Sequence, residues 1–377
     1  MKFIHLSDLH LGKRVHEFSM HEEQKAILEQ ILSMIDTEMP HGILIAGDIY
    51  DKSVPPAEAV VLFDDFLARL AQRGLQVFII SGNHDSPERI AFGARIMQRE
   101  GIHLSPVYDG SITPFTVTDG KERVNVYMLP FIKPAHVRRY FESEDIVTYT
   151  DAVRVAIRHM NVNENECNIL LTHQFVTGAS RSDSEEISVG GTDNVNADVF
   201  RGFDYVALGH IHSPQTCGAP HIRYCGTPLK YSFSEMRDVK SLTVVELGHA
   251  EPVIRTVPLT PIHDMGELRG TFEEIMDAEY AQGTPKDRYL RIVLTDENDI
   301  PDAVGRLRTV YKNLMQLEYD NTRTAKNNLI SGAVQTQMKT PFELFSEFYE
   351  LQNNAPMSRE QRDYMLELIE AIGEASV

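Results

Sequence analysis

Five short segments of the 377-residue chain carry side chains suited to binding metal ions beside a phosphate ester. The segments are Asp8-Leu-His10, Gly47-Asp48, Gly82-Asn83-His84-Asp85, Thr172-His173 and Gly209-His210-Ile-His212. Each follows directly on a short apolar run of the kind that forms a buried strand. In an open parallel sheet the carboxyl ends of the strands share one edge, and ligands bind in the crevice there. We therefore expect segments far apart in the sequence to converge on one site.

The residue types predict a pair of divalent cations. Carboxylate, amide and imidazole ligands together favour Mn, Fe or Zn, whereas the lack of thiolates disfavours a structural zinc site. A carboxylate can bridge two cations because each of its oxygens can bind one of them. Two cations about 3.5–4 Å apart polarise a phosphate oxygen and generate hydroxide near neutral pH. The D-x-H and H-x-H spacings suit extended backbone, in which residues i and i+2 point the same way.

Each segment taken alone has a simpler explanation. A single D-x-H after a strand is commonly a cap or a hydrogen-bonded pair in the core. GNHD alone can be a turn, because Gly and Asn tolerate left-handed conformations. H-x-H alone is a weak signal. All five segments in order, each at the end of a strand, favour a catalytic centre.

The elements that must position these segments are strands with helices between them. Strands are predicted at 3–6, 43–46, 77–80, 169–171 and 205–208, with further strands at 124–129 and 242–247. Helical spacing of apolar residues predicts one helix around 27–35 and another from about 57, ending near Gly74. This alternation indicates an α/β fold whose sheet is buried on both faces. The core is expected to close near residue 260.

The pattern changes after Pro261. A strand at 289–294, a helix at about 300–311 and a strand at 314–319 predict a compact βαβ unit, followed by a polar linker at 320–339. Two helices should then begin at the capping boxes Thr340-Pro341-Phe-Glu343 and Ser358-Arg-Glu-Gln361. A polar, glycine-rich stretch at 178–194 is predicted to be a long surface loop.

Composition narrows the function classes. With 36 basic and 55 acidic residues the formal charge is −19, which argues against a free-standing nucleic-acid binder. It does not argue against an enzyme whose metals and partner supply positive charge. Three cysteines without paired spacing predict no disulfide framework. No signal-like start or bilayer-length apolar stretch occurs in the sequence, so we expect a cytoplasmic protein without a membrane segment.

The motif series DxH, GDxxD, GNHD, H and GHxH resembles that of the calcineurin-like metallophosphoesterases. The flanking residues resemble one branch of them, the SbcD family of bacterial nuclease subunits, which is related to the Mre-type repair nucleases. The segments that carry this likeness are SDLHLGKR, GDIYDKSVPP, SGNHDSPER, LTHQFVTGA, GFDYVALGHIHSPQ and YCGTPLKYSFSE. They lie within residues 1 to about 240, beyond which the resemblance continues only as a layout.

The resemblance implies three parts. Residues 1–260 would form a nuclease domain, an α/β metallophosphoesterase sheet sandwich flanked by helices. Residues 261–335 would form a small α+β cap domain that contacts DNA. Residues 340–377 would form a helical tail that binds the ATPase partner.

The resemblance also implies roles for the motif residues. One metal ion would be held by Asp8, His10 and His212. The other would be held by Asn83, His173 and His210, with Asp48 as the bridge between the two ions. The ions would be Mn²⁺, with Mg²⁺, Fe²⁺ or Zn²⁺ as alternatives. His84 would not bind metal but would face the scissile phosphate, stabilising the transition state or protonating the leaving oxygen, a role suited to a group that titrates near neutral pH.

Three nearby residues keep open interpretations. Asp85 either orients His84 or caps the helix that begins at Pro87. Asp51 stands where some relatives carry histidine, so a structural role is favoured for it over a base. Arg89, one turn into the helix after GNHD, either reaches a phosphate or is a solvated charge.

The implied activity is that of a metal-dependent DNA nuclease. Such a protein acts as a double-strand exonuclease and a single-strand or hairpin endonuclease within an ATP-dependent SbcCD-type complex in DNA repair and recombination. Its partners would be DNA, an SbcC-type coiled-coil ATPase bound through residues 340–377, and a second copy bound through the helices at 56–73 and 87–99. The tail helices carry broad apolar faces, and short helices are marginal in water unless they are buried against something. Docking of the tail on its own chain is the alternative.

Three other functions remain as alternatives. A phosphoprotein phosphatase would carry GDxxDRG and GNHE, where this chain has Lys52-Ser53 and Asp85. A small-molecule or nucleotide phosphodiesterase of the same superfamily is often a single domain, which leaves the residues after 260 unexplained. A scaffold stabilised by metals would tend to lose ligands, whereas all seven ligand positions and His84 are present.

Overall fold

The computed structural model describes residues 1–120, 122–185, 193–248, 251–321, 342, 345–346, 348–350 and 356–374. The chain divides into two compact units. One comprises Met1–Arg269, Glu273–Val293 and Asp302–Glu318, and the other comprises Gly270–Phe272, Leu294–Pro301 and Tyr319–Val377. Among the described residues, no helix combines the length and the apolar character needed to cross a bilayer.

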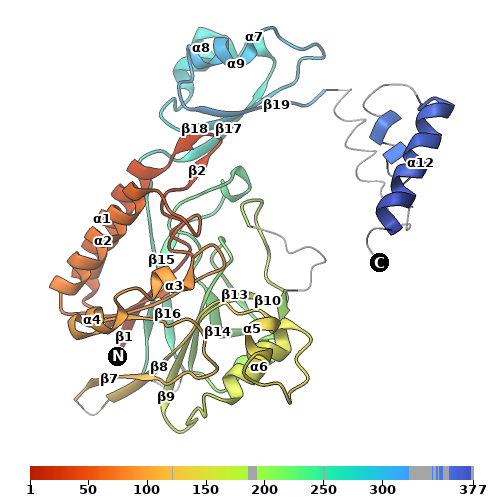
Figure 1. Cartoon of the computed structure of the whole chain (residues 1–377). Coiled ribbons are helices and arrows are strands. Elements are labelled where there is room, and N and C mark those ends of the chain that lie inside the picture. The colour runs from red at the N-terminus through yellow and green to blue at the C-terminus, as the bar shows by residue number, and fades with distance from the viewer. Residues whose placement is uncertain are drawn as a thin grey trace. The chain divides into compact units, whose positions relative to one another are not determined.

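The first unit contains two six-stranded sheets (Figure 1). In the first, four parallel strands are extended at one side by two antiparallel strands. Its order is β16 (Val253–Pro258), β15 (Ser241–Glu246), β1 (Lys2–Leu6), β4 (Gly42–Ala46), β5 (Gln76–Ile80) and β6 (Ile102–Leu104).

The second sheet also has four parallel strands, but with one antiparallel strand at each side. Its order is β13 (Gln215–Cys217), β14 (Ala219–Tyr224), β12 (Tyr205–Gly209), β9 (Cys167–His173), β8 (Glu122–Leu129) and β7 (Phe115–Asp119). All seven predicted strands are therefore present, most with bounds within a residue or two of the expectation.

Buried apolar side chains pack between the two sheets, Phe3, Phe78 and Leu171 among them. On the outer faces, helices α1 (His21–Glu38) and α2 (Ala57–Gln72) cover the first sheet, and α6 (Tyr149–Arg158) covers the second. Both faces of each sheet are thus buried, which is why the central strands are nearly continuous apolar runs. The α/β sheet sandwich flanked by helices is confirmed. The strand–helix pattern alone does not say which strands pair, so it left the number of sheets open.

Shorter elements complete this part of the chain. They are β2 (Arg14–Val15), β3 (Phe18–Ser19), α3 (Pro87–Ile90), α4 (Ala94–Met97), α5 (Pro134–Arg138), β10 (Phe175–Val176), β11 (Asn194–Val195) and the 3₁₀ turns Gln98–Glu100, Ala197–Phe200 and Phe233–Glu235. The loop predicted at 178–194 is described only up to residue 185 and from 193, and residues 186–192 lie outside the described part.

After residue 260 the chain forms a three-stranded sheet in the order β17-β18-β19. Its elements are β17 (Met265–Gly270), α7 (Phe272–Met276), α8 (Ala278–Gly283), β18 (Tyr289–Leu294), α9 (Ala303–Arg308) and β19 (Leu314–Tyr319). The two predicted strands are confirmed. The helix is shorter than expected, and it begins only at Ala303 because Asp302 has left-handed backbone with a φ of 50°. The sequence reasoning missed β17, α7 and α8.

The last described helix, α12 (Arg359–Glu374), begins at the predicted capping box. The Ser358 backbone N–H donates to Gln361 Oε1 over 2.8 Å, and the Gln361 N–H donates to Ser358 Oγ over 3.3 Å. The helix expected from Pro341 falls largely on residues outside the described part, although 342, 345–346 and 348–350 are helical. The linker expected at 320–339 also lies almost wholly outside it.

Candidate metal centre

The five motif segments follow strands of both sheets and meet at one end of the sandwich. Asp8, His10, Asp48 and Asn83 come after β1, β4 and β5 of the first sheet. His173 ends β9 of the second sheet, and His210 and His212 follow β12. Backbone bonds hold the first loops together, since the Asp8 N–H donates to Gly47 O and the His10 N–H to Asp48 O, each over 3.0 Å.

Two groups of ligand atoms face one another at this end. In one, atoms of Asp8, His10 and His212 all lie within 4.8 Å of each other, and the Nε2 atoms of the two histidines are 3.2 Å apart. In the other, Asn83 Oδ1 lies 3.0 Å from His173 Nε2 and 2.9 Å from His210 Nδ1. Each group gathers lone pairs at a distance that a metal ion fits.

Asp48 lies between the two groups. Its Oδ2 is 3.3 Å from His173 Nε2 and 3.8 Å from His10 Nε2. The side chain is almost wholly buried. A carboxylate in contact with a histidine of each group has the placement that a bridging ligand needs.

In two histidines, the ring nitrogen that faces away from the cluster has a hydrogen-bond partner. That partner determines the orientation of the ring, and with it which nitrogen faces the cluster. His173 Nδ1 lies 2.8 Å from Ala46 O and donates to that carbonyl, so Nε2 is the ring nitrogen that faces Asn83. His212 Nδ1 lies 2.6 Å from Ser184 Oγ, and its Nε2 faces His10. Metal-binding histidines usually donate their second N–H in this way. The donor set and the ring orientations therefore fit divalent cations.

Burial and neighbouring charges shift the pKa values of the predicted ligands. Burial holds the pKa of His10 and of His210 well below the ordinary value, which favours the neutral ring that a metal ligand requires. Burial alone would raise the pKa of Asp48, but His173, His10 and His84 hold it well below its ordinary value. Burial alone would lower the pKa of His173, but Asp48 raises it to about 9. A cation binding here takes the place of the proton that His173 and Asp48 share.

His84 lies beside the cluster and is oriented by backbone. Its Nδ1 lies 2.9 Å from Asp51 O, and its own N–H donates to Asp48 Oδ1 over 2.9 Å. Nε2 points inward, 4.0 Å from Asp48 Oδ2, and the side chain keeps 16% exposure. This ring is more exposed than the four other histidines of the group.

Several ligand positions adopt a backbone conformation that is unfavourable for side chains other than glycine. Asp8, His10, Asp48 and His210 have φ values of 53°, 45°, 49° and 102°. Such conformations cluster at functional sites, where the surrounding structure enforces them. Asp and His are among the residues other than glycine that adopt such backbone most often.

The glycines of the motifs are explained by close packing. A Cβ on Gly82 would lie 2.1 Å from Asp48 Oδ1, and one on Gly209 would lie 1.9 Å from Ala46 O. Either contact would push strands of the two sheets or the bridging carboxylate aside. Gly82 and Gly209 are therefore required because the chain packs closely at these positions, and not only because a turn is formed there.

Asp85 has neither of the roles expected for it. Its carboxylate accepts backbone N–H bonds from Ile49 (3.1 Å), Tyr50 (3.0 Å) and Gly82 (2.9 Å). Ser86, not Asp85, caps the following helix, with its Oγ accepting from the Arg89 N–H. Asp85 therefore joins the loops after β4 and β5, and burial raises its pKa to about 6.

Asp51 and Arg89 lie beside the predicted ligands, and the Asp51 carboxylate is 3.7 Å from His10 Nδ1. The Asp51 carboxylate is 2.7 Å from Lys13 Nζ, and its carbonyl is the group that orients His84. Arg89 Nη1 donates to Ser53 O over 2.6 Å, so in this structure it holds the loop after β4.

The sequence reasoning missed four residues around His212, namely Ser184, Glu185, Glu235 and Lys240. They hydrogen-bond the ring or the peptide groups of His212, or one another. The pKa of Glu235 would be raised by burial, but His212 and Lys240 hold it far below its ordinary value. Glu235 ends the YCGTPLKYSFSE segment, which was the one signal available in the sequence.

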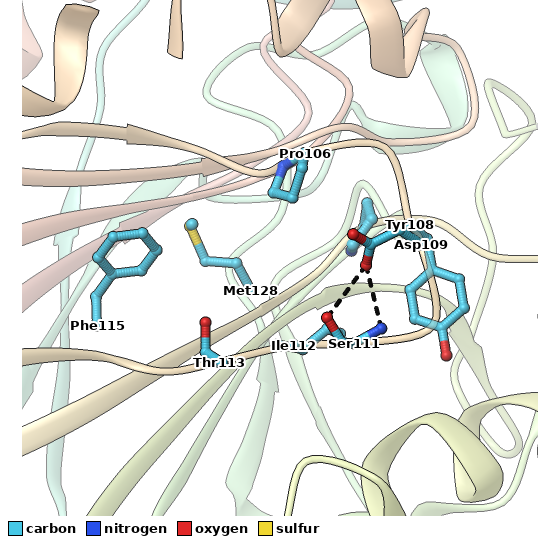
Figure 2. Close-up of a pocket in the computed structure, with 9 residues that line it drawn as sticks. Pro106, Tyr108, Asp109, Ser111, Ile112, Thr113, Phe115 and Met128 are labelled. Carbon is cyan, nitrogen blue, oxygen red and sulfur yellow. Dashed lines mark hydrogen bonds between the residues drawn. The ribbon is translucent and has the colours of Figure 1, made fainter. Parts of the chain in front are cut away.

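A hollow elsewhere on the sandwich is separate from this centre (Figure 2). Asp109 is its acidic residue, and it accepts hydrogen bonds from the Ser111 N–H and Oγ. None of the predicted site residues lines it. Its lining consists of Pro106, Tyr108, Asp109, Ser111, Ile112, Thr113, Phe115, Met128 and Pro130.

Comparison with known proteins places this geometry in a family. The sequence profile of the calcineurin-like phosphoesterases matches residues 1–214, and that described as the type 5 capsule protein repressor C-terminal domain, or SbcD_C, matches residues 261–353. The SbcD subunit of the SbcCD nuclease from Staphylococcus epidermidis is 30% identical over 380 residues, which is 99% of each chain. The chain belongs to the SbcD family of calcineurin-like phosphoesterases. The SbcD-family protein of Staphylococcus saprophyticus is also 30% identical, over 84% of each chain.

One solved structure, a dimetal phosphatase, resembles part of this SbcD-family chain weakly. This phosphatase, from Danio rerio, is 10% identical, with a TM-score of 0.39, and the match covers 68% of this chain and 96% of that one. The family assignment therefore rests on the sequence matches.

Proposed function

We propose that this chain is the metal-dependent nuclease subunit of an SbcCD-type complex and hydrolyses the phosphodiester bonds of DNA. The observation that carries the proposal is the convergence of seven ligands and His84 at one end of the sandwich, in a chain that matches the Staphylococcus epidermidis SbcCD nuclease subunit along 99% of its length. The profile match at 261–353 supports this function over that of a single-domain phosphodiesterase.

The proposed ligand sets are those that the resemblance implies. Asp8, His10 and His212 would hold one ion, and Asn83, His173 and His210 the other, with Asp48 between them. Two bound cations, Mn²⁺ in this proposal, would polarise the phosphate and lower the pKa of a bound water. The side chains supply the rest: they fix the positions of the ions, and the buried walls exclude other water.

His84 is proposed to act on the substrate. Its Nδ1 is turned to the Asp51 carbonyl, so Nε2 is the atom that faces a phosphate at the centre. A protonated Nε2 can stabilise charge on the phosphate oxygens or give its proton to the leaving oxygen.

The test of this function is a nuclease assay on linear duplex and hairpin DNA. We expect cleavage with Mn²⁺, none in excess chelator, and an effect of ATP only when the ATPase subunit is added. Hydrolysis of a nitrophenyl phosphodiester without any cleavage of DNA would favour the small-molecule phosphodiesterase instead. Cleavage that persists in chelator would contradict the two-metal centre.

We further propose the domain limits 1–260 for the nuclease domain, 261–335 for a cap that contacts DNA and 340–377 for the tail. The start of the second profile match at residue 261 supports the first boundary. The buried Glu23 of α1 accepts from the Ile262 N–H (2.9 Å) and the His263 N–H (3.1 Å), which anchors the chain where the cap begins.

A homodimer is proposed through α2 and the helices after GNHD. Large apolar side chains stand exposed there: Phe92 is 85%, Ile96 75% and Val61 68% exposed. Exposed apolar groups that gather on neighbouring helices are typical of a protein interface.

Phe92→Asp is expected to convert a dimer into a monomer, because a carboxylate would have to be buried in the interface. Molar mass from light scattering during size exclusion measures this. Val147, 69% exposed and outside these helices, gives the matched control Val147→Asp, which should leave the mass unchanged. A dimer that survives Phe92→Asp contradicts this interface.

The tail is proposed to bind the coiled-coil ATPase partner. In α12, Tyr364 is 63% and Leu368 40% exposed, and Phe348 nearby in the sequence is 57% exposed. These side chains are available to a partner.

Deleting residues 340–377 should abolish binding of the ATPase subunit and leave the nuclease centre intact, since no proposed ligand lies beyond His212. Pull-down with the purified ATPase and Mn²⁺-dependent DNA cleavage by the truncated chain measure the two parts. The double substitution Tyr364→Asp/Leu368→Asp should act like the deletion. Unchanged capture of the truncated chain would show that the partner binds elsewhere.

A further inference from the structure

Glu235 is a buried carboxylate next to the metal centre but outside its ligand set. It is 1% exposed, and its Oε2 lies 2.6 Å from Nζ of Lys240, which is 3% exposed. Removing two charges from water is unfavourable unless hydrogen bonds satisfy both groups. The groups that satisfy Glu235 therefore show what it holds in place.

A serine connects Glu235 to a proposed metal ligand. Ser184 Oγ donates to Glu235 Oε1 and lies 2.6 Å from His212 Nδ1, nearer to that nitrogen than Glu235 Oε1 itself, which is 3.5 Å away. A carboxylate paired with an ammonium accepts hydrogen bonds only. The serine hydrogen is thus given to Glu235, and the serine oxygen is left to accept from His212 Nδ1–H.

This order of donors fixes the tautomer of His212. With the proton on Nδ1, the lone pair of Nε2 points toward His10 Nε2, 3.2 Å away. The same group of residues holds the backbone of His212: its N–H donates to Glu185 Oε1 over 2.7 Å, and its carbonyl accepts from Lys240 Nζ over 2.9 Å. Ring and peptide groups are fixed together.

The other half of the centre is oriented differently. His173 Nδ1 is held by the main-chain carbonyl of Ala46, and no side chain is needed for that contact. A side-chain substitution that breaks the path through Ser184 should therefore affect one metal position and spare the other.

We propose that Glu235, acting through the Ser184 hydroxyl, is a positioning residue that sets the affinity of the Asp8–His10–His212 position for its metal ion. The inference rests on the proposed two-metal function and adds to it the residues that make the two positions unequal. Lys240 keeps Glu235 in place and is not itself in contact with the ring of His212.

Two serines of one loop allow a matched test. Ser184→Ala removes the hydroxyl that contacts His212. Ser182 Oγ also contacts Glu235 (3.4 Å) and Ser184 Oγ (2.9 Å), and it has no bond to His212, so Ser182→Ala is the control. Ser184→Thr keeps a hydroxyl and should restore the parent behaviour. Glu235→Gln should weaken the same position, and adding Ser184→Ala to it should change little further, because both break one path.

The measurement is Mn²⁺ titration of the metal-free full chain by calorimetry, with metal content by mass spectrometry. Loss of such a partner of a metal ligand typically weakens binding about 10–100-fold. We expect that loss at one of two positions in Ser184→Ala and none in Ser182→Ala. Two unchanged positions in Ser184→Ala would overturn the proposal. Equal losses in both alanine variants would also overturn it, since the effect would then come from the loop and not from the contact with His212.

The parent protein separates this proposal from the one on which it rests. A parent that binds fewer than two Mn²⁺ ions contradicts the two-metal function itself. A parent that binds two, with Ser184→Ala indistinguishable from it, contradicts only the role of Glu235 and Ser184. The melting temperature of each metal-free variant checks folding, and a parent-like value is expected for both alanine variants.

Discussion

Asp48→Ala is expected to abolish DNA cleavage and to release at least one of the two metal equivalents. Asp48 lies 3.3 Å from His173 and 3.8 Å from His10, so its loss removes a carboxylate that is close to both halves of the centre. Metal ions supply several kcal/mol of transition-state stabilisation. Since about 1.4 kcal/mol is a factor of ten in rate, the rate should fall on the order of 10³-fold or more.

Metal analysis and cleavage of linear duplex DNA with Mn²⁺ measure the two effects. Asp109→Ala is the matched control, because Asp109 lines the hollow in Figure 2 and bonds only to Ser111 among the contacts described. It should retain full activity and both ions. Full metal content in Asp48→Ala would show that the bridging assignment is wrong.

His84→Ala is expected to retain both metal ions and to cleave DNA far more slowly. Help from a general acid is typically worth about 10²–10⁴-fold, and any stabilisation of charge on the phosphate adds to this. His84 touches Asp48 through its backbone N–H, which alanine keeps. The bridging carboxylate should therefore stay in place.

Two substrates separate the possible roles of His84. A nitrophenyl phosphodiester has a leaving group that departs without a proton, so its hydrolysis should suffer much less than that of DNA if His84 is the acid. Equal losses on both substrates indicate stabilisation of phosphate charge. Loss of metal from His84→Ala would mean that the residue is a ligand and that the role assignment must be redrawn.

Much of the fold could be predicted from local pattern. Strands β1, β4, β5, β9 and β12 are apolar because both of their faces are buried, and this leaves a clear signal in the sequence. Their division between two sheets could not be predicted from that pattern, since burial on both faces is the same in one open sheet and in a sandwich. The resemblance to a known family supplied the sandwich.

The candidate site divides in a similar way. The structure brings the eight predicted side chains together, and their roles stay predictions. Asp85 was misread because a carboxylate after GNH gives no sign that it will bond to Ile49 and Tyr50, more than thirty positions earlier. Glu235 and Ser184 were missed because their contact with His212 depends on the folding of separate loops. Local sequence therefore predicts the reactive side chains of the site better than it predicts the residues that position them.

Because the predicted ligands come from both sheets, metal ions bound at the centre would also help to hold the two sheets together. Asp8, Asp48 and Asn83 belong to loops of one layer, and His173 and His210 to the other. Ions bound between them would connect the two layers at this end of the sandwich. Because a ligand that binds only the folded state stabilises it, the free energy of metal binding is also free energy that resists the parting of the layers. The catalytic activity and the free energy that holds the two layers together would then both increase with the concentration of metal.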